Sequence, residues 1–262
     1  MTERNARTVA AVASDFQKTY DPAFAWKTAV NAVLALPGLR GCWTMSAFDS
    51  AGAAQDQSGH GHVLTYAGNP TYNVVGLAPY IDFDGAGDYL WRADEADLDI
   101  TGLETYVPAA RRGLTFGGWF YVNALTGLDG LMAKWDQIAV DERSYMIYGS
   151  GANAAAVISQ DGTAGTLVTI VNGNFALQTW QQIVGRFDPG ASLDCWVNDT
   201  VTSQVTAAAS VFSGAGALNI GNYSNLLGPL NGRASLCWLC ATLLSDTEIK
   251  ALYQHTRALY GV

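Results

Sequence analysis

Three carboxylates at alternate positions, Glu95, Asp97 and Asp99, make the segment RADEADLD the first candidate for catalysis in this sequence. On a β-strand, residues i, i+2 and i+4 point to one face, and retaining glycoside hydrolysis uses two carboxyl groups about 5–5.5 Å apart. The start of the segment, RADEA, is instead typical of a turn, where alternate residues do not share a face. We therefore interpret these carboxylates as structural and assign no catalytic residue.

A second acidic group, Asp82, Asp84 and Asp88, offers the hard oxygen ligands that calcium prefers. Asp82 and Asp84 would share one strand face, opposite Ile81 and Phe83, and the Ala-Gly pair that follows favours a hairpin turn. The pattern favours a hairpin whose carboxylates face water. Calcium binding by the three aspartates stays open as the alternative.

Two histidines, His60 and His62, flank Gly61 in the polar turn SGHGH. Imidazole is a common metal ligand, but a metal site needs a third ligand, and the neighbouring sequence offers none. We therefore expect both side chains to be solvated, and we assign no metal ligand to the chain.

The spacing of the cysteines does not predict a redox or metal site. Cys237 and Cys240 have suitable spacing, but ASLCWLCATLL is typical of a buried strand, on which residues i and i+3 point to opposite faces. Together with Cys42 and Cys195, they are expected to be buried free thiols. No nucleophile elbow, phosphate-binding loop or dinucleotide fingerprint occurs, so we expect neither enzyme activity nor a cofactor.

Composition indicates a folded, acidic protein. The 262 residues are 49% hydrophobic and 14% charged, with 28 glycines and 8 tryptophans, which excludes disorder over most of the chain. The net charge of −9 argues against a nucleic-acid partner. No apolar run is long enough to span a membrane, and the N-terminal residues lack a signal-peptide core, so we expect no export by that route.

From Gly41 onward, short apolar or alternating runs are separated by turn residues, with no helix between them. This spacing predicts a β-sandwich or jelly roll. A short C-terminal helix follows, because Ser245 and Glu248 form a capping box before an apolar face. The expected strands include HVLTYAG, YIDFDG, DYLWRA, LTFGGWFYV, GLMAKWD, SYMIYGS, AAAVISQDG, TLVTIVNGN, WQQIVGRFD, SLDCWVND, ALNIGN and GRASLCWLCATLL.

The first 38 residues differ from the rest and predict a helical arm. Asp21-Pro22 is a helix start, and AFAWKTAVNAVLAL is apolar almost all round until Leu36-Pro37-Gly38 ends it. Such a helix needs cover, either from its own domain or from another subunit. We expect the second, with the apolar residues Phe24, Trp26, Val30, Val33 and Leu34 mediating assembly.

The ordered set of β motifs resembles the LamG-like (concanavalin A-like) jelly-roll family, of the kind found in pentraxin-related modules and bacteriophage structural proteins. The matching pieces are DFDG to DYL (82–90), LTFGGWFYV with Trp119, WQQIV to WVN (180–198), LNIG (218–221), and the closing strand followed by LSDTEI (244–249). Asp199 departs from the glycine that is frequent after Asn198. The resemblance implies a LamG-like jelly-roll domain (39–262), whereas the N-terminal helical arm (1–38) is not part of the common domain of that family.

The resemblance implies a non-enzymatic virion structural protein, a capsid decoration or tail-associated subunit made in the host cytoplasm. It would form a homo-oligomer, for which we expect a trimer, and contact other virion proteins. The alternative is a carbohydrate-binding module, in which exposed aromatic side chains such as Trp91, Trp135 or Tyr223 stack on sugar rings. Glucanases of similar architecture carry an E-x-D-x-E constellation, which residues 95–99 match only in part.

Overall fold

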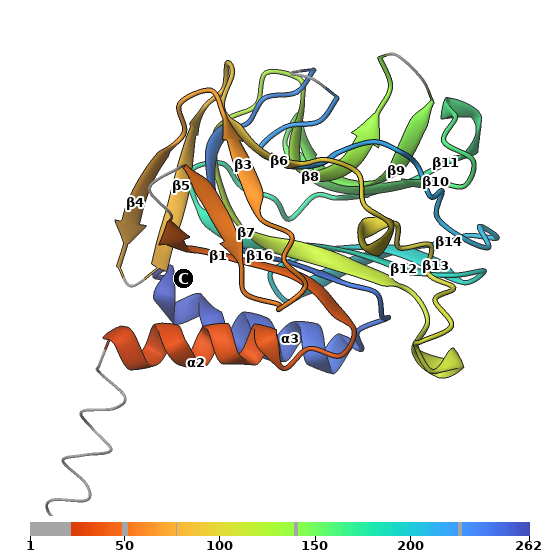
Figure 1. Ribbon diagram of the computed structural model, residues 1–262, viewed down its shortest axis with the longest axis horizontal. Helices are drawn as coiled ribbons and strands as arrows, with labels where there is room; N and C mark the ends of the chain where they lie inside the picture. The colour runs from red at the N-terminus through yellow and green to blue at the C-terminus, as the bar shows by residue number, and fades with distance from the viewer. Residues whose placement is uncertain (1–21, 49–51, 77, 139–140, 225–226) are drawn as a thin grey trace, which may run out of the picture.

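The computed structural model describes residues 22–48, 52–76, 78–138, 141–224 and 227–262. Within these residues strands dominate and form two stacked layers, with the helices α2 (Pro22–Leu34) and α3 (Asp246–Thr256) lying below the lower layer (Figure 1). This architecture confirms the expected all-β sandwich with a short C-terminal helix.

The upper layer is an antiparallel array in which neighbouring strands come from distant parts of the chain. Strand β15 lies between β6 and β8, so that Asn219 pairs with Trp91 on one side and Ala133 on the other. In spatial order the strands are β11 (Leu167–Asn172), β10 (Asn153–Ser159), β9 (Glu142–Ser150), β8 (Leu128–Asp136), β15 (Leu218–Ile220), β6 (Tyr89–Arg92) and β3 (Leu64–Ala67).

The lower layer is organised around β16 (Asn231–Cys240). This strand pairs with β7 (Leu114–Ala124) along one edge and with β1 (Leu39–Phe48) and β5 (Ala78–Asp84) along the other. Beyond β7 follow β12 (Trp180–Asp188), β13 (Ser192–Val197) and β14 (Thr200–Val205); β2 (Ala53–Asp56) joins β1 to β3, and β4 (Thr71–Val75) pairs with β5.

Alternate residues of the lower layer enter two different hydrophobic clusters. The inner cluster lies between the layers and takes Phe116 and Phe120 from β7, together with Tyr145 and Ile147 from β9. In β16, Cys237 belongs to this cluster and Cys240 to the one on the other face, as strand alternation requires. All four cysteines are buried free thiols, as expected.

The second cluster, here called the helix-covered cluster, lies between the lower layer and the helices. Its centre consists of Trp119, Trp180, Trp196 and Trp238, packed against Tyr253 and Tyr260. The rings of Trp119 and Tyr260 stack with centroids 4.2 Å apart, and the indole N–H of Trp119 donates a hydrogen bond of 2.9 Å to Thr256 Oγ1. The lower layer is therefore buried on both faces, which explains its long apolar strands.

The C-terminal helix α3 (Asp246–Thr256) begins at the predicted capping box. Ser245 Oγ accepts from the Glu248 backbone N–H, and the Glu248 carboxylate accepts from the Ser245 N–H at 2.7 Å. Ile249, Leu252 and Tyr253 then face the helix-covered cluster. Three short 3-10 turns precede α3, and one follows it: η1 (Ala96–Leu98), η2 (Ala109–Arg111), η3 (Ala164–Thr166) and η4 (Arg257–Leu259).

The N-terminal helix α2 (Pro22–Leu34) packs beside α3 and over β1. Ala29 and Val33 are fully buried in the helix-covered cluster, and Trp26 and Val30 pack against it. The premise that this helix lacks cover from its own domain is therefore wrong, because the lower layer presents a second apolar face. The side chain of Phe24 and residues 1–21 lie outside what the structure describes.

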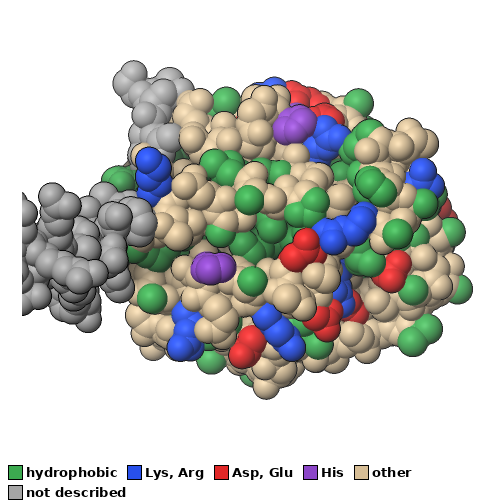
Figure 2. All heavy atoms as spheres, turned by 90° about the horizontal axis from the view of Figure 1, so that it is seen from below, with side chains coloured by type: hydrophobic (Ala, Val, Ile, Leu, Met, Phe, Trp, Pro, Cys, Tyr) green, Lys and Arg blue, Asp and Glu red, His purple; other side chains and the backbone are tan. Residues whose placement is uncertain are grey.

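Seen from the helix side, hydrophobic side chains gather in a band among charged and polar ones (Figure 2). Leu34, at the end of α2, is exposed, whereas Ala29 and Val33 of the same helix are buried. Within the described residues, no helix is long and apolar enough to cross a membrane.

Candidate functional site

The Asp82, Asp84 and Asp88 group closes turns rather than facing water throughout. Asp84 Oδ1 accepts the N–H groups of Ala86 and Gly87 at 2.7 and 3.1 Å, and these bonds lower the pKa of Asp84. Asp88 is buried and accepts from the Asn69 N–H at 2.6 Å, so the expectation that it is solvated is wrong.

The same three aspartates line an open hollow of about 420 Å³. Arg233 Nε lies 3.5 Å from Asp82 Oδ1, and backbone N–H groups occupy oxygens of the other two carboxylates. Calcium binding by the three aspartates stays an open alternative, which these contacts do not favour because they already engage carboxylate oxygens.

The carboxylates of Glu95, Asp97 and Asp99 do not share one face, so the geometry does not favour the catalytic interpretation. They lie on and beside the 3-10 turn η1, not on a strand. Glu95 pairs with Arg92 and His62, Asp97 with Arg40, and Asp99 with Lys134 at 2.8 Å. Because His62 lies between Glu95 and Asp97 and Lys134 holds Asp99, basic side chains engage these carboxylates, and no two of them are presented together to a substrate.

Lys134, on β8, holds the segment 94–99 in place. Its ammonium group is fully buried and contacts Asp94 Oδ1 at 2.7 Å, Asp99 Oδ1 at 2.8 Å and the carbonyl oxygens of Gly214 and Gly216. A buried charge needs partners of this kind. The ion pairs fix the segment after β6 against β8.

The turn that holds the two histidines is shaped by Asp56 and two glycines. The Asp56 carboxylate accepts the N–H groups of Cys42, Ser58 and His62 at 2.8–3.0 Å. Burial acts to raise the pKa of Asp56, but these bonds outweigh it and leave the pKa lowered. Gly59 and Gly61 have φ angles of +91° and +83°, a region that favours glycine.

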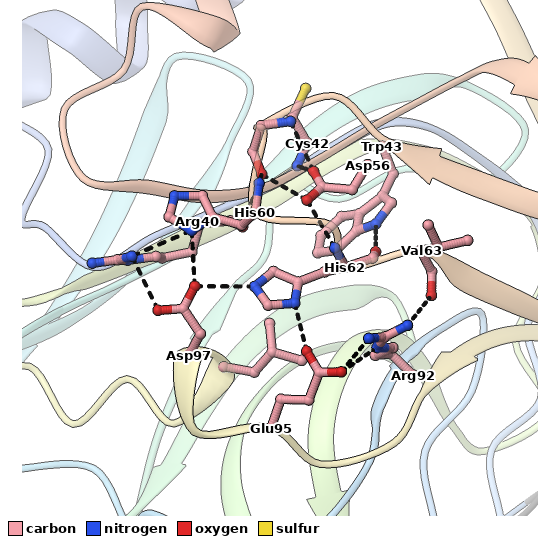
Figure 3. Close-up of polar contacts among 12 residues, drawn as sticks. Arg40, Cys42, Trp43, Asp56, His60, His62, Val63, Arg92, Glu95 and Asp97 are labelled. Atoms are coloured by element: carbon pink, nitrogen blue, oxygen red, sulfur yellow. Dashed lines mark hydrogen bonds and ion pairs between the residues drawn. The ribbon is translucent and has the colours of Figure 1, made fainter.

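This turn brings the histidines to the acidic segment 35 residues further on (Figure 3). His62 Nδ1 lies 2.8 Å from Glu95 Oε2, and His62 Nε2 lies 3.2 Å from Asp97 Oδ2. His60 Nδ1 lies 2.9 Å from the same Asp97 oxygen. We call His60, His62 and Asp97 the histidine cluster.

Two expectations about the histidines need correction. His62 is 2% exposed, so it is not a solvated loop residue. A third ligand atom is also present, because the donor atoms of the histidine cluster all lie within 4.8 Å of one another. Local sequence spacing does not predict this contact, since the contact depends on the turn at 56–62 facing η1.

An aromatic pocket of about 280 Å³ opens on the upper layer. Tyr89 and Trp91 alternate with Leu90 on β6, so they point away from the core in which Leu90 is buried. Trp135 forms the opposite wall from β8, and its indole N–H donates to Gln137 Oε1 at 3.1 Å, which orients the ring. Polar groups come from Asp136, Asn219 and Ser224.

The three aromatic candidates for sugar stacking have different environments. Trp91 is 36% exposed, Trp135 is 3% exposed but lines the pocket, and Tyr223 is buried beside Trp135. The expectation of free exposure is therefore wrong for Trp135 and Tyr223. The structure places two of the three side chains, Trp91 and Trp135, in one pocket.

Comparisons with known proteins give a fold but no family. No protein-family model and no curated protein sequence matches the chain. Among solved structures, the botulinum neurotoxin serotype G binding domain aligns with a TM-score of 0.63 at 10% identity, covering 82% of this chain and 50% of that one. The serotype D ligand-binding domain in complex with N-acetylneuraminic acid aligns at 0.63 and 9% identity, covering 86% and 52%.

The binding domain of Paraclostridial Mosquitocidal Protein 1 aligns with a TM-score of 0.62 at 12% identity, covering 82% of this chain and 52% of that one. This chain thus spans about half the length of the structures it matches. At such identities the matches show the fold alone. They show a jelly-roll-like β-sandwich that is shared with about half of each of those binding domains, whereas the phage association rests on the sequence resemblance.

Proposed function

We propose that this chain is a non-enzymatic carbohydrate-binding module and that the aromatic pocket is its glycan site. The observation that carries the proposal is the placement of exposed Trp91 against the oriented indole of Trp135 in one hollow. An apolar hollow with a few convergent polar groups is the usual form of a small-ligand site.

The pocket chemistry suits a sugar. Aromatic faces complement the C–H face of a pyranose ring, while carboxylate, amide and hydroxyl groups bond to its hydroxyls. Asp136, Asn219 and Ser224 supply these three group types around the aromatic walls. A volume of about 280 Å³ fits one or two sugar units.

The charge of the pocket favours a neutral sugar. Among the described residues that line it, only Asp136 is charged, and the whole chain carries −9. A carboxylate accepts hydrogen bonds from sugar hydroxyls but repels an anionic sugar. We therefore expect neutral hexoses or pentoses in preference to sialylated glycans.

The fold comparison adds support. Two of the matched binding domains were solved with N-acetylneuraminic acid or SialylT, and this chain aligns with 52% of each of them. Another was solved with the protein receptor synaptotagmin II, so the architecture also serves protein recognition.

The test is a glycan array of neutral and sialylated oligosaccharides, followed by calorimetric titration of the strongest neutral ligand. Trp91→Ala should raise Kd at least tenfold, which corresponds to about 1.4 kcal/mol. Tyr72→Ala serves as the matched control, because Tyr72 is an exposed aromatic residue on a different strand, β4. Unchanged affinity in Trp91→Ala, or no bound glycan on the array, would refute the proposal.

The virion role and the homo-oligomer stay predictions without added support. The homo-oligomer was argued from an uncovered helix, and α2 is covered by its own domain. The virion role was argued from the family resemblance, the absence of a signal-peptide core and the same helix. A glycan-binding module is also compatible with a virion surface, so the two roles do not exclude each other.

A further inference from the structure

We propose that His60, His62 and Asp97 form a binding site for a divalent transition-metal ion, with Zn²⁺ the best fit. This site is separate from the glycan pocket and does not depend on it. Three features of the histidine cluster support such a site: the donor atoms lie close together, the Glu95 carboxylate directs the His62 ring, and the cluster is accessible from solvent.

The donor atoms already have metal-site spacing. In a tetrahedral site with Zn–N and Zn–O bonds of about 2.0–2.1 Å, neighbouring ligand atoms lie roughly 3.3 Å apart. Asp97 Oδ2 lies 2.9 Å from His60 Nδ1 and 3.2 Å from His62 Nε2. All three donors lie within 4.8 Å of one another.

The hydrogen bond to Glu95 determines which nitrogen of His62 is free. A carboxylate only accepts, so the 2.8 Å contact places a proton on His62 Nδ1. In the neutral ring Nε2 then carries a lone pair, and this lone pair faces the Asp97 oxygen. Two electron-rich atoms in contact require a cation between them.

His60 contributes the third donor. Its Nδ1 lies 2.9 Å from the same Asp97 oxygen and 3.4 Å from Arg40 Nη1, and the tautomer of the ring decides which of these contacts is a hydrogen bond. A proton links two atoms, whereas one metal ion accounts for the convergence of all three donors on one point.

The surroundings resemble the outer shell of a metal site. Histidine ligands usually donate their second N–H to a carboxylate, as His62 does to Glu95, which is itself held by Arg92. Arg40 donates to Asp97 Oδ1 at 3.0 Å and leaves Oδ2 for the cluster. Figure 3 shows His62 between the two carboxylates.

The ligand set selects the class of metal. Two imidazoles and one carboxylate suit zinc and its neighbours, whereas calcium and magnesium prefer oxygen-only sites. The side chains of His60 and Asp97 are about one-third exposed, so an ion can enter from solvent. Three protein ligands leave a fourth position for water or another ligand.

The consequence is a cross-link between two distant segments. The ion would join the turn at 56–62 to η1, next to the end of β6. Binding to the native state alone raises the melting temperature, and the stabilisation grows with the logarithm of the ratio of free Zn²⁺ to Kd. A structural role of this kind requires no catalysis.

The experiment uses untagged full-length protein, titrated with Zn²⁺ by calorimetry and with Co²⁺ by visible absorption. We expect one ion per chain and a Co²⁺ spectrum typical of nitrogen and oxygen ligands. His60→Ala should weaken Zn²⁺ binding at least tenfold, and its exposed loop position makes misfolding no concern. His255→Ala is the matched control, because His255 is an exposed histidine on α3.

Two further variants sharpen the result. Asp97→Asn should also lose the site, and Glu95→Gln should weaken it about 10- to 100-fold through His62. Trp91→Ala should bind Zn²⁺ normally. The absence of Zn²⁺ binding in the parent, or equal affinity in His60→Ala and His255→Ala, would overturn the proposal and leave a proton on His62 as the linking cation.

Discussion

Two groups of aromatic side chains built on strands differ in what covers them. The helix-covered cluster collects four tryptophans on the lower layer, and α2 and α3 close over it. The aromatic pocket places Tyr89, Trp91 and Trp135 on the upper layer, where no described helix lies over them. The same residue type therefore forms a second core on one side and an open hollow on the other.

The difference shows how function can be separated from stability in this fold. Aromatic surface that the chain covers with its own helices contributes to folding, because it is removed from water when the protein folds. Aromatic surface left open in a hollow is available to a ligand. The comparison predicts that substitutions in the two groups affect different properties.

The largest expected effect is on the stability of the helix-covered cluster. Trp119→Ala should lower the free energy of unfolding by about 3–5 kcal/mol, because it leaves a cavity and removes the hydrogen bond to Thr256. Chemical denaturation measures this loss. Trp91→Ala, the comparison variant, should cost only about 1 kcal/mol since its ring is partly exposed. Equal losses would mean that the pocket belongs to the core.

An intermediate effect is expected for the packing of α2 on the helix-covered cluster. Val33→Ala should cost about 2 kcal/mol, because two buried methyl groups on α2 are lost from the helix-covered cluster. Leu34→Ala, at the next position but 38% exposed, should change stability by about 0.5 kcal/mol or less. If both variants had small effects, α2 would be free of the sandwich, and the assembly role would regain its argument.

The smallest effect concerns the cap of α3. Ser245→Ala should cost about 1 kcal/mol. Partial burial acts to raise the pKa of Glu248, but hydrogen bonds from Arg111 and Ser245 outweigh it and hold the pKa below its ordinary value of 4.5. A lowered folded-state pKa gives stability above pH 4.5 that is lost as the pH falls through the lowered value.

The matching acid test uses Glu248→Gln. Its stability deficit at neutral pH should shrink as the pH falls below 4.5 through the lowered pKa of the parent carboxylate, which then becomes protonated as well. Denaturation curves of parent and variant at neutral pH and through the acid range measure this. A deficit independent of pH would mean that the carboxylate charge contributes nothing to the cap.

Local patterns predicted the fold because strands and caps depend on nearby residues. The strand alternation around Trp119, the opposite orientation of Cys237 and Cys240, and the Ser245 capping box all follow from short segments. The second buried face of the lower layer could not be predicted from short segments. It depends on helices from both ends of the chain meeting over one sheet.

The candidate sites were predicted only in part, for the same reason. Trp91 and Trp135 were identified by residue type, but their meeting depends on β15 lying between β6 and β8. The third ligand, which the sequence around His60 and His62 does not supply, is Asp97. In the sequence, Asp97 was considered only as one of the three carboxylates at 95, 97 and 99, and these were interpreted as structural. Contacts across 35 residues leave no trace in local spacing.

The central place of β16 has a consequence for biosynthesis. β1 and β7 each pair with this strand, and residues 231–240 leave the ribosome after both of them. Until then the nascent chain carries unpaired strand edges and uncovered tryptophans, the features that promote aggregation. The lower layer is therefore expected to complete its pairing only once residues 231–240 are available, and to do so slowly, as non-local strand pairing generally does.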